Sequence, residues 1–160
     1  EAFAPVFTPA FGPILVLSTW LAALFVLWMV AARAIWLVTL GPEAPASVMA
    51  FLAQVLTTPA GWVMAIVGCA VGFVFAVAAL AVSVLSFPLV LDRHMGVPQA
   101  VATSIRFTRE NLRAAATWGA VVAGLLILGA IPGLIGLAFV LPLLGHATWH
   151  LYRAATAPRG

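Results

Sequence analysis

Four long runs of apolar residues dominate the chain, and short segments rich in Pro, Gly and charged residues separate them. The runs cover about residues 13–40, 58–87, 112–131 and 134–152. A helix needs roughly 20 apolar residues to cross a hydrocarbon layer. Because lipid offers no water to the backbone, each run is predicted to be a transmembrane helix. The sequence therefore predicts an all-α fold, a polytopic membrane bundle of about four transmembrane helices.

Two shorter segments have apolar residues at helical spacing but are too short to span a membrane. They cover about residues 47–56 and 98–110. Ser47 is a residue type that favours a helix N-cap. Arg106 and Arg109 fall on the polar side of the second segment. Both segments are predicted to be amphipathic interfacial helices.

The connection between the third and fourth runs is very short. Pro132 and Gly133 form a typical turn pair, which favours a tight helical hairpin. The alternative is a single long helix broken at this pair. Pro142 lies inside the fourth run and is predicted to kink that helix.

The composition excludes a soluble globular domain. Of 160 residues, 65% are hydrophobic and 7% are charged, whereas soluble domains carry roughly 25% charged residues. We interpret residues 1–160 as a single membrane domain. The net charge of +3 comes from Arg and not from Lys. In a membrane protein such a surplus indicates topology, so no nucleic-acid partner is expected.

The arginines are unevenly distributed between the connections. Arg93, Arg106, Arg109 and Arg113 lie between the second and third runs, and Arg153 and Arg159 lie at and beyond the end of the fourth. The connection between the first two runs has no Arg or Lys. The positive-inside rule therefore predicts that the connection between the second and third runs and the C-terminus are cytoplasmic.

Glycines in the second and third runs are candidate helix-packing positions. Gly68 and Gly72 have the four-residue spacing that lets two membrane helices approach closely. Gly119 and Gly124 occur in the third run. The bilayer and other membrane subunits are therefore the expected partners.

A cluster of charged residues is expected at the ends of the second, third and fourth runs. It consists of Asp92, Arg93, Arg113 and Arg153. Charges near lipid usually pair, because an isolated charge is costly to desolvate. Asp92 is expected to pair with Arg153 or Arg113, as a structural clamp.

His146 and His150 form the most distinct local motif. Their four-residue spacing puts both imidazoles on one helix face, where two such rings can hold a metal ion. His94 is expected at the same membrane level and is a candidate third ligand. The alternative is that these are ordinary interfacial residues. No cofactor is expected, and metal or haem binding at these histidines is kept as an alternative.

Catalytic motifs are absent from the sequence. A phosphate loop is excluded because the chain has no lysine. The apolar runs carry almost no ionisable residues at mid-depth, which argues against a proton-coupled transporter. The protein is not expected to be an enzyme.

The stretch from Ser86 to Arg153 resembles a bacterial integral-membrane family of unknown function, some of whose members are labelled cytochrome c oxidase subunits. The closest matches are Phe87-Pro88, Leu91-Asp92-Arg93, Trp118-Gly119 and the string Leu141-Pro142 through Gly145-His146-Ala147-Thr148-Trp149-His150-Leu151-Tyr152-Arg153. Family members look longer at the N-terminus. The resemblance therefore implies that this chain is the C-terminal part of a longer protein of the bacterial inner membrane.

The resemblance implies a role beside an oxidase but not as its catalytic subunit. A haem–copper subunit needs more histidine ligands than the three in this chain. The leading hypothesis is a non-catalytic accessory or assembly subunit of a respiratory or photosynthetic electron-transfer complex. A small-solute transporter or channel is one alternative, and metal or haem handling through His146 and His150 is the other.

Overall fold

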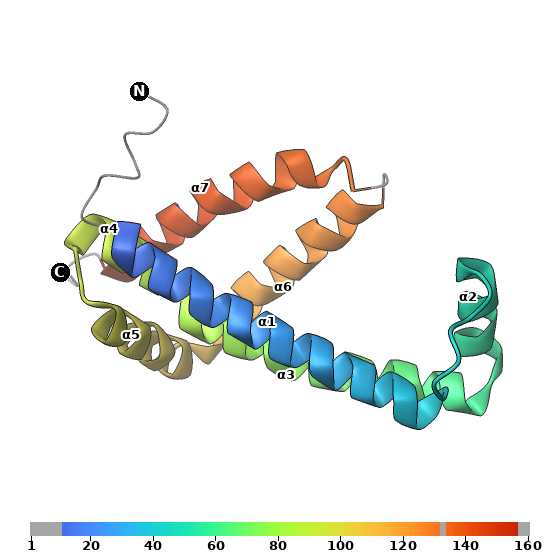
Figure 1. Cartoon of the computed structure of the whole chain (residues 1–160). Coiled ribbons are helices and arrows are strands. Elements are labelled where there is room, and N and C mark those ends of the chain that lie inside the picture. The colour runs from blue at the N-terminus through green and yellow to red at the C-terminus, as the bar shows by residue number, and fades with distance from the viewer. Residues whose placement is uncertain (1–10, 132–133, 157–160) are drawn as a thin grey trace. The chain divides into compact units, whose positions relative to one another are not determined.

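The computed structural model describes residues 11–131 and 134–156, and within them every regular element is a helix (Figure 1). The helices are α1 (Phe11–Thr39), α2 (Val48–Thr57), α3 (Pro59–Ser83), α4 (Ser86–Arg93), α5 (Val97–Glu110), α6 (Leu112–Ala130) and α7 (Leu137–Thr156). The predicted all-α fold class is confirmed.

Three of the described stretches are long and apolar enough to cross a membrane. They are α1, α6 and the combined stretch of α3 and α4 from Pro59 to Arg93. The helix α7 is 20 residues long but is not among them. Its C-terminal half carries His146, His150 and Arg153, which make it more polar than the others. The first three spans agree with the sequence, and the fourth stays a prediction.

The second predicted span, residues 58–87, is interrupted. The helix α3 ends at Ser83, and α4 begins at Ser86. Pro88 explains this break, because a proline ring collides with the carbonyl four residues earlier and removes one backbone donor. That carbonyl belongs to Val84, in the turn between the two helices. Pro88 therefore lies in the first turn of α4 and not at the end of a continuous helix.

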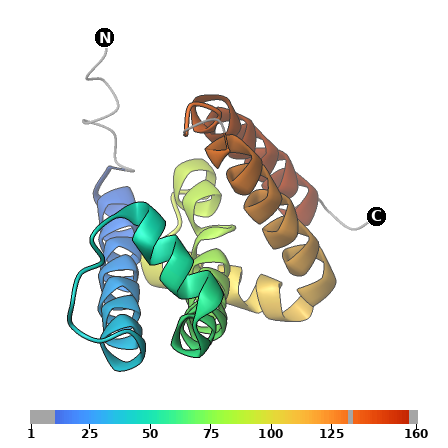
Figure 2. The ribbon, with the colours of Figure 1, turned by 90° about the vertical axis from the view of Figure 1, so that its right-hand side faces the viewer.

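The described chain divides into two compact units. Unit 2 consists of residues 18–79, which are most of α1, all of α2 and most of α3. Within it α1 and α3 run side by side, as the different views show (Figures 1 and 2). Unit 1 contains residue 17 and the described residues before it, together with those from Leu80 onward.

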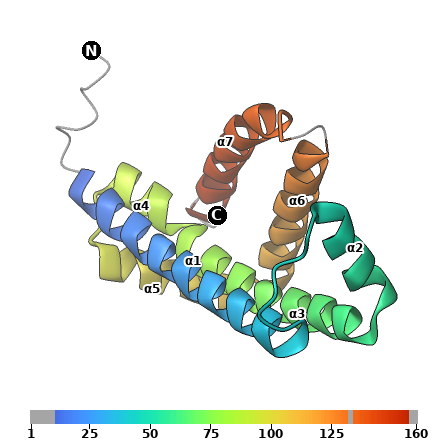
Figure 3. The same cartoon turned by 45° about the vertical axis from the view of Figure 1, so that its right-hand side comes forward.

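The helix α2 leads directly into α3, and the two meet at an angle (Figure 3). Ser47 caps α2 as predicted, since its hydroxyl accepts a hydrogen bond from the Ala50 N–H at 3.1 Å. The Thr58 hydroxyl accepts from the Gly61 N–H at 3.0 Å. A Cβ on Gly61 would lie 2.4 Å from the Gln54 carbonyl oxygen, so only glycine fits there.

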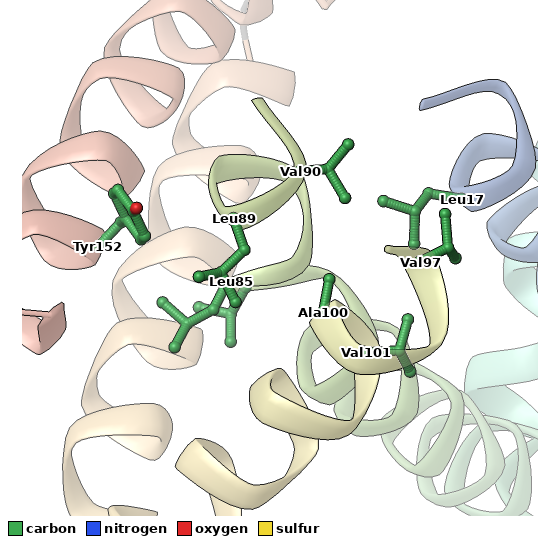
Figure 4. Packing of buried hydrophobic residues seen from close by; sticks show 9 residues of the cluster. Leu17, Leu85, Leu89, Val90, Val97, Ala100, Val101 and Tyr152 are labelled. Atoms are coloured by element: carbon green, nitrogen blue, oxygen red, sulfur yellow. The ribbon is translucent and has the colours of Figure 1, made fainter. Parts of the chain in front are cut away.

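The core of unit 1 lies between α4 and α5 (Figure 4). Its buried apolar residues are Leu17, Val84, Leu85, Leu89, Val90, Val97, Ala100, Val101 and Tyr152. Ser104 is also fully buried there. Its hydroxyl donates to the Ala81 carbonyl at 2.7 Å and accepts from the Leu85 N–H at 3.2 Å. It thus satisfies two backbone groups at the α3–α4 break.

The helix α5 matches the predicted segment 98–110, but its apolar side packs inward. Val97, Ala100 and Val101 are buried, whereas Arg106 and Arg109 are exposed. Its amphipathic pattern therefore reflects packing inside unit 1, and its interfacial position stays a prediction.

The helices α6 and α7 form an antiparallel hairpin, as the tight-turn prediction requires (Figure 3). Pro132 and Gly133 lie outside the described residues. A Cβ on Gly136 would lie 2.7 Å from the Gly129 carbonyl oxygen, so glycine lets the turn before α7 approach the backbone of α6 closely. The alternative of one long broken helix is wrong.

Candidate functional site

Polar side chains from α4 and α7 meet in unit 1. The Tyr152 hydroxyl donates a 2.5 Å hydrogen bond to the Asp92 carboxylate. Arg93, the last residue of α4, is exposed. Tyr152 is only 2% exposed, and it projects from α7 toward the core (Figure 4). Since Asp92 itself is exposed, this contact joins a buried ring to a carboxylate at the surface.

The predicted partner of Asp92 was wrong. We expected Arg153 or Arg113, but within residues 11–131 and 134–156 no ion pair joins Asp92 to either of them. One residue along a helix turns the side chain by about 100°. The face of α7 that reaches Asp92 therefore presents Tyr152 and leaves Arg153 exposed.

The three histidines do not form one site. His146 and His150 are exposed on α7, and His94 is the exposed C-cap of α4, with a φ of 49°. Among the residues that the structure describes, no three His, Cys, Asp or Glu side chains form a possible metal site. The third ligand predicted from His94 is therefore not brought to the pair.

His146 is oriented by its own helix. Its Nδ1 lies 2.9 Å from the Pro142 carbonyl oxygen. Because a carbonyl only accepts, Nδ1 is the donor in this hydrogen bond, and Nε2 is the ring nitrogen left for a ligand. His146 and His150 thus keep the i, i+4 spacing that a two-ligand metal site requires, and this possibility stays a prediction.

The four predicted packing glycines differ in what faces them. A Cβ on Gly72 would lie 3.6 Å from the Trp28 Nε1, and one on Gly119 would lie 3.2 Å from the Leu80 Cδ2. The corresponding positions at Gly68 and Gly124 have nothing within 4 Å. Gly72 and Gly119 therefore pack inside their own units, whereas Gly68 and Gly124 are open.

Two polar residues that matter for packing, Ser104 and Tyr152, were not predicted from the sequence. Ser104 lies at helical spacing from Val97, Ala100 and Thr108, so its place on the apolar side of α5 was available as a signal. Tyr152 is the single tyrosine of the chain. Only its position at the end of an apolar run, where aromatic rings with a polar tip are common, marked it out.

The family of predicted integral membrane proteins called DUF2189 matches residues 1–92. The chain belongs to this family. The DUF2189 match includes α1, α2 and α3 and ends within α4, so the string from Leu141 to Arg153 lies outside it. No curated protein and no solved structure matches the chain.

Membership of DUF2189 and the three apolar spans agree on the class of protein. It is a multi-pass integral membrane protein, in contact with the lipid bilayer. The predicted resemblance to a membrane family of unknown function is confirmed at this level. The match carries no oxidase description.

Proposed function

We propose that the protein is a non-catalytic subunit that packs against another transmembrane helix in a larger membrane complex. The observation that carries this proposal is an open face of small residues on α6. Ala116 and Ala120 are exposed, and a Cβ on Gly124 would meet nothing within 4 Å. Small residues at four-residue spacing let two helix backbones approach closely in lipid.

The opposite side of α6 is already used within unit 1. Ala115 and Gly129 are buried there, and Gly119 faces Leu80. The open face is therefore not required for folding of the chain alone, which supports its use by a partner. The resemblance of the C-terminal part points to an accessory or assembly subunit of a respiratory or photosynthetic electron-transfer complex, associated with cytochrome oxidase.

Extraction from the native membrane tests the proposal. The tagged protein is extracted in mild detergent, separated on a native gel, and analysed by visible spectroscopy and mass spectrometry. We expect co-migrating membrane chains that include cytochromes. The Gly124→Leu variant should lose these chains, because a branched side chain would separate the two backbones.

Ala114→Leu is the matched control, because Ala114 is exposed on the same helix about 120° away from Ala120 and ten residues before Gly124. This variant should keep its partners. Migration of the unaltered protein alone, with no haem absorption, would rule out the accessory role.

The proposed orientation places the α3–α6 connection in the cytoplasm of a bacterial cell, with the protein in the inner membrane. Arg106, Arg109 and Arg113 are exposed along this connection. The connection between α1 and α3 carries no Arg or Lys. An Arg106→Cys variant in a Cys69→Ser background should react with a membrane-impermeant maleimide only after the cells are opened. Labelling of intact cells would reverse the orientation.

A further inference from the structure

We propose that unit 2 binds an anionic phospholipid in a groove between α1 and α3, with the phosphate at Arg33. The groove has a volume of about 320 Å³. Its lining includes Ala32 and Trp36 of α1 and Ala65 and Gly68 of α3. This lining suits a hydrocarbon chain, because it is apolar and includes small residues from both helices.

A second hollow continues from the groove and contains the one cation of unit 2. It has a volume of about 430 Å³ and shares Ala32 and Trp36 with the first. Its other lining residues are Met29, Arg33, Pro42, Ala44 and Pro45. The apolar groove thus leads to Arg33, so an acyl chain in the groove would bring its phosphate to this side chain.

The position of Arg33 along α1 fits the level of a lipid headgroup. The helix has 29 residues, so it is about 43 Å long and exceeds a hydrocarbon layer of about 30 Å. Arg33 lies six residues before the end of α1, about 9 Å from it. The helix exceeds the hydrocarbon layer by about 13 Å, so a residue about 9 Å from its end can lie at the membrane surface, where the guanidinium would meet the headgroups.

Arg33 is available for a phosphate. Its side chain is exposed, and within the described residues it forms no ion pair. Glu43 is the only acid in residues 18–79. A guanidinium binds phosphate oxygens through paired hydrogen bonds, and such bonds are stronger in a poorly hydrated setting.

Trp36 lies where the groove and the hollow join. Its ring stacks on Phe51 of α2 with a centroid separation of 5.4 Å. Its Nε1 is buried and has no acceptor among the described residues. An unpaired buried donor is unfavourable, and an ester or phosphate oxygen at the junction would supply an acceptor after a small turn of the ring.

A partner helix is the main competing occupant. Arg33 argues against it, because a second copy of this chain would bring another Arg33 and few acidic residues to the site. The number of acids in the whole chain is four, against seven basic residues. Charge complementarity therefore favours a negatively charged lipid.

Native mass spectrometry of the full chain in mild detergent tests the proposal. Dioleoyl phosphatidylglycerol and dioleoyl phosphatidylcholine are added separately, and the bound fractions are compared. We expect phosphatidylglycerol to bind at least about tenfold more tightly, because it keeps a net negative charge, whereas the choline cation of phosphatidylcholine offsets the charge of the phosphate that Arg33 would bind. Arg33→Gln should remove this preference, whereas the exposed Arg106→Gln should retain it.

A second variant fills the groove without changing the headgroup site. Gly68→Leu should weaken binding of both lipids, because the new side chain enters space that is now open. Gly124→Leu on α6 is its control and should leave lipid binding unchanged. Thermal unfolding checks that each variant is folded.

Two results would overturn the proposal. One is equal binding of phosphatidylglycerol by the unaltered protein and by folded Arg33→Gln. The other is a dimer that Gly68→Leu dissociates, which would assign the groove to a second copy. If Gly124→Leu loses its partner chains but still prefers phosphatidylglycerol, the lipid site is supported separately from the proposed subunit role.

Discussion

The α4–α5 region and the α1–α3 pair use apolar residues in different ways. The helices α4 and α5 are short, and they contain most of the buried side chains of the described chain. The helices α1 and α3 are longer and more apolar, yet each has a single buried residue, Leu17 in α1 and Gly61 in α3. Apolar content in this protein therefore indicates contact with lipid, whereas amphipathic pattern indicates a packed core.

This difference has a physical cause. In lipid there is little hydrophobic gain from burying one apolar helix against another, so close packing needs small residues or hydrogen bonds. The α4–α5 region contains a mixture of polar and apolar residues and includes the hydrogen bonds of Ser104. The α1–α3 pair instead leaves an open groove beside Gly68.

The largest expected effect is a contrast between two leucines. Leu89 of α4 is 2% exposed, and Leu27 of α1 is 57% exposed. Leu89→Ala should lower the free energy of unfolding by about 3 kcal/mol, because it leaves a cavity in the core. Leu27→Ala should cost less than about 0.5 kcal/mol, since its side chain contacts detergent or lipid. Thermal and denaturant unfolding in detergent measure both, and equal losses would break the comparison.

The second prediction concerns Gly61 of α3, which packs closely against the backbone of α2. Gly61→Ala should lower the free energy of unfolding by about 2 kcal/mol or separate α2 from α3, because the new methyl group meets backbone atoms of Gln54 and Val55. Gly68→Ala on the same helix meets nothing within 4 Å. Its stability should stay the same or rise slightly, because Ala favours a helix over Gly. Unfolding and hydrogen exchange of α2 measure the difference, and similar behaviour of the two variants would count against the tight junction.

The sequence predicts the helices well but predicts their contacts poorly. Run length and hydropathy place α1 and α6 to within a few residues, because the bilayer sets both quantities. The break at Val84–Leu85 was missed, since the effect of Pro88 lies four residues before it. The choice of Tyr152 over Arg153 as the partner of Asp92 depends on the rotation of α7, and composition does not specify this rotation.

The smallest effect is expected at the contact between α4 and α7. Tyr152→Phe keeps the buried ring and removes only the hydroxyl that donates to Asp92. The free energy of unfolding should fall by about 1.5 kcal/mol, the low end for a hydrogen bond to a charged group, because the exposed carboxylate can regain water. Asp92→Asn should cost less, since its side-chain oxygen still accepts the bond. If Tyr152→Phe instead unfolds like the unaltered protein in detergent, burial of the ring alone holds α7 against the core. The contact between α4 and α7 would then be stabilised by apolar packing and not by its hydrogen bond, which weakens the contrast with the α1–α3 pair.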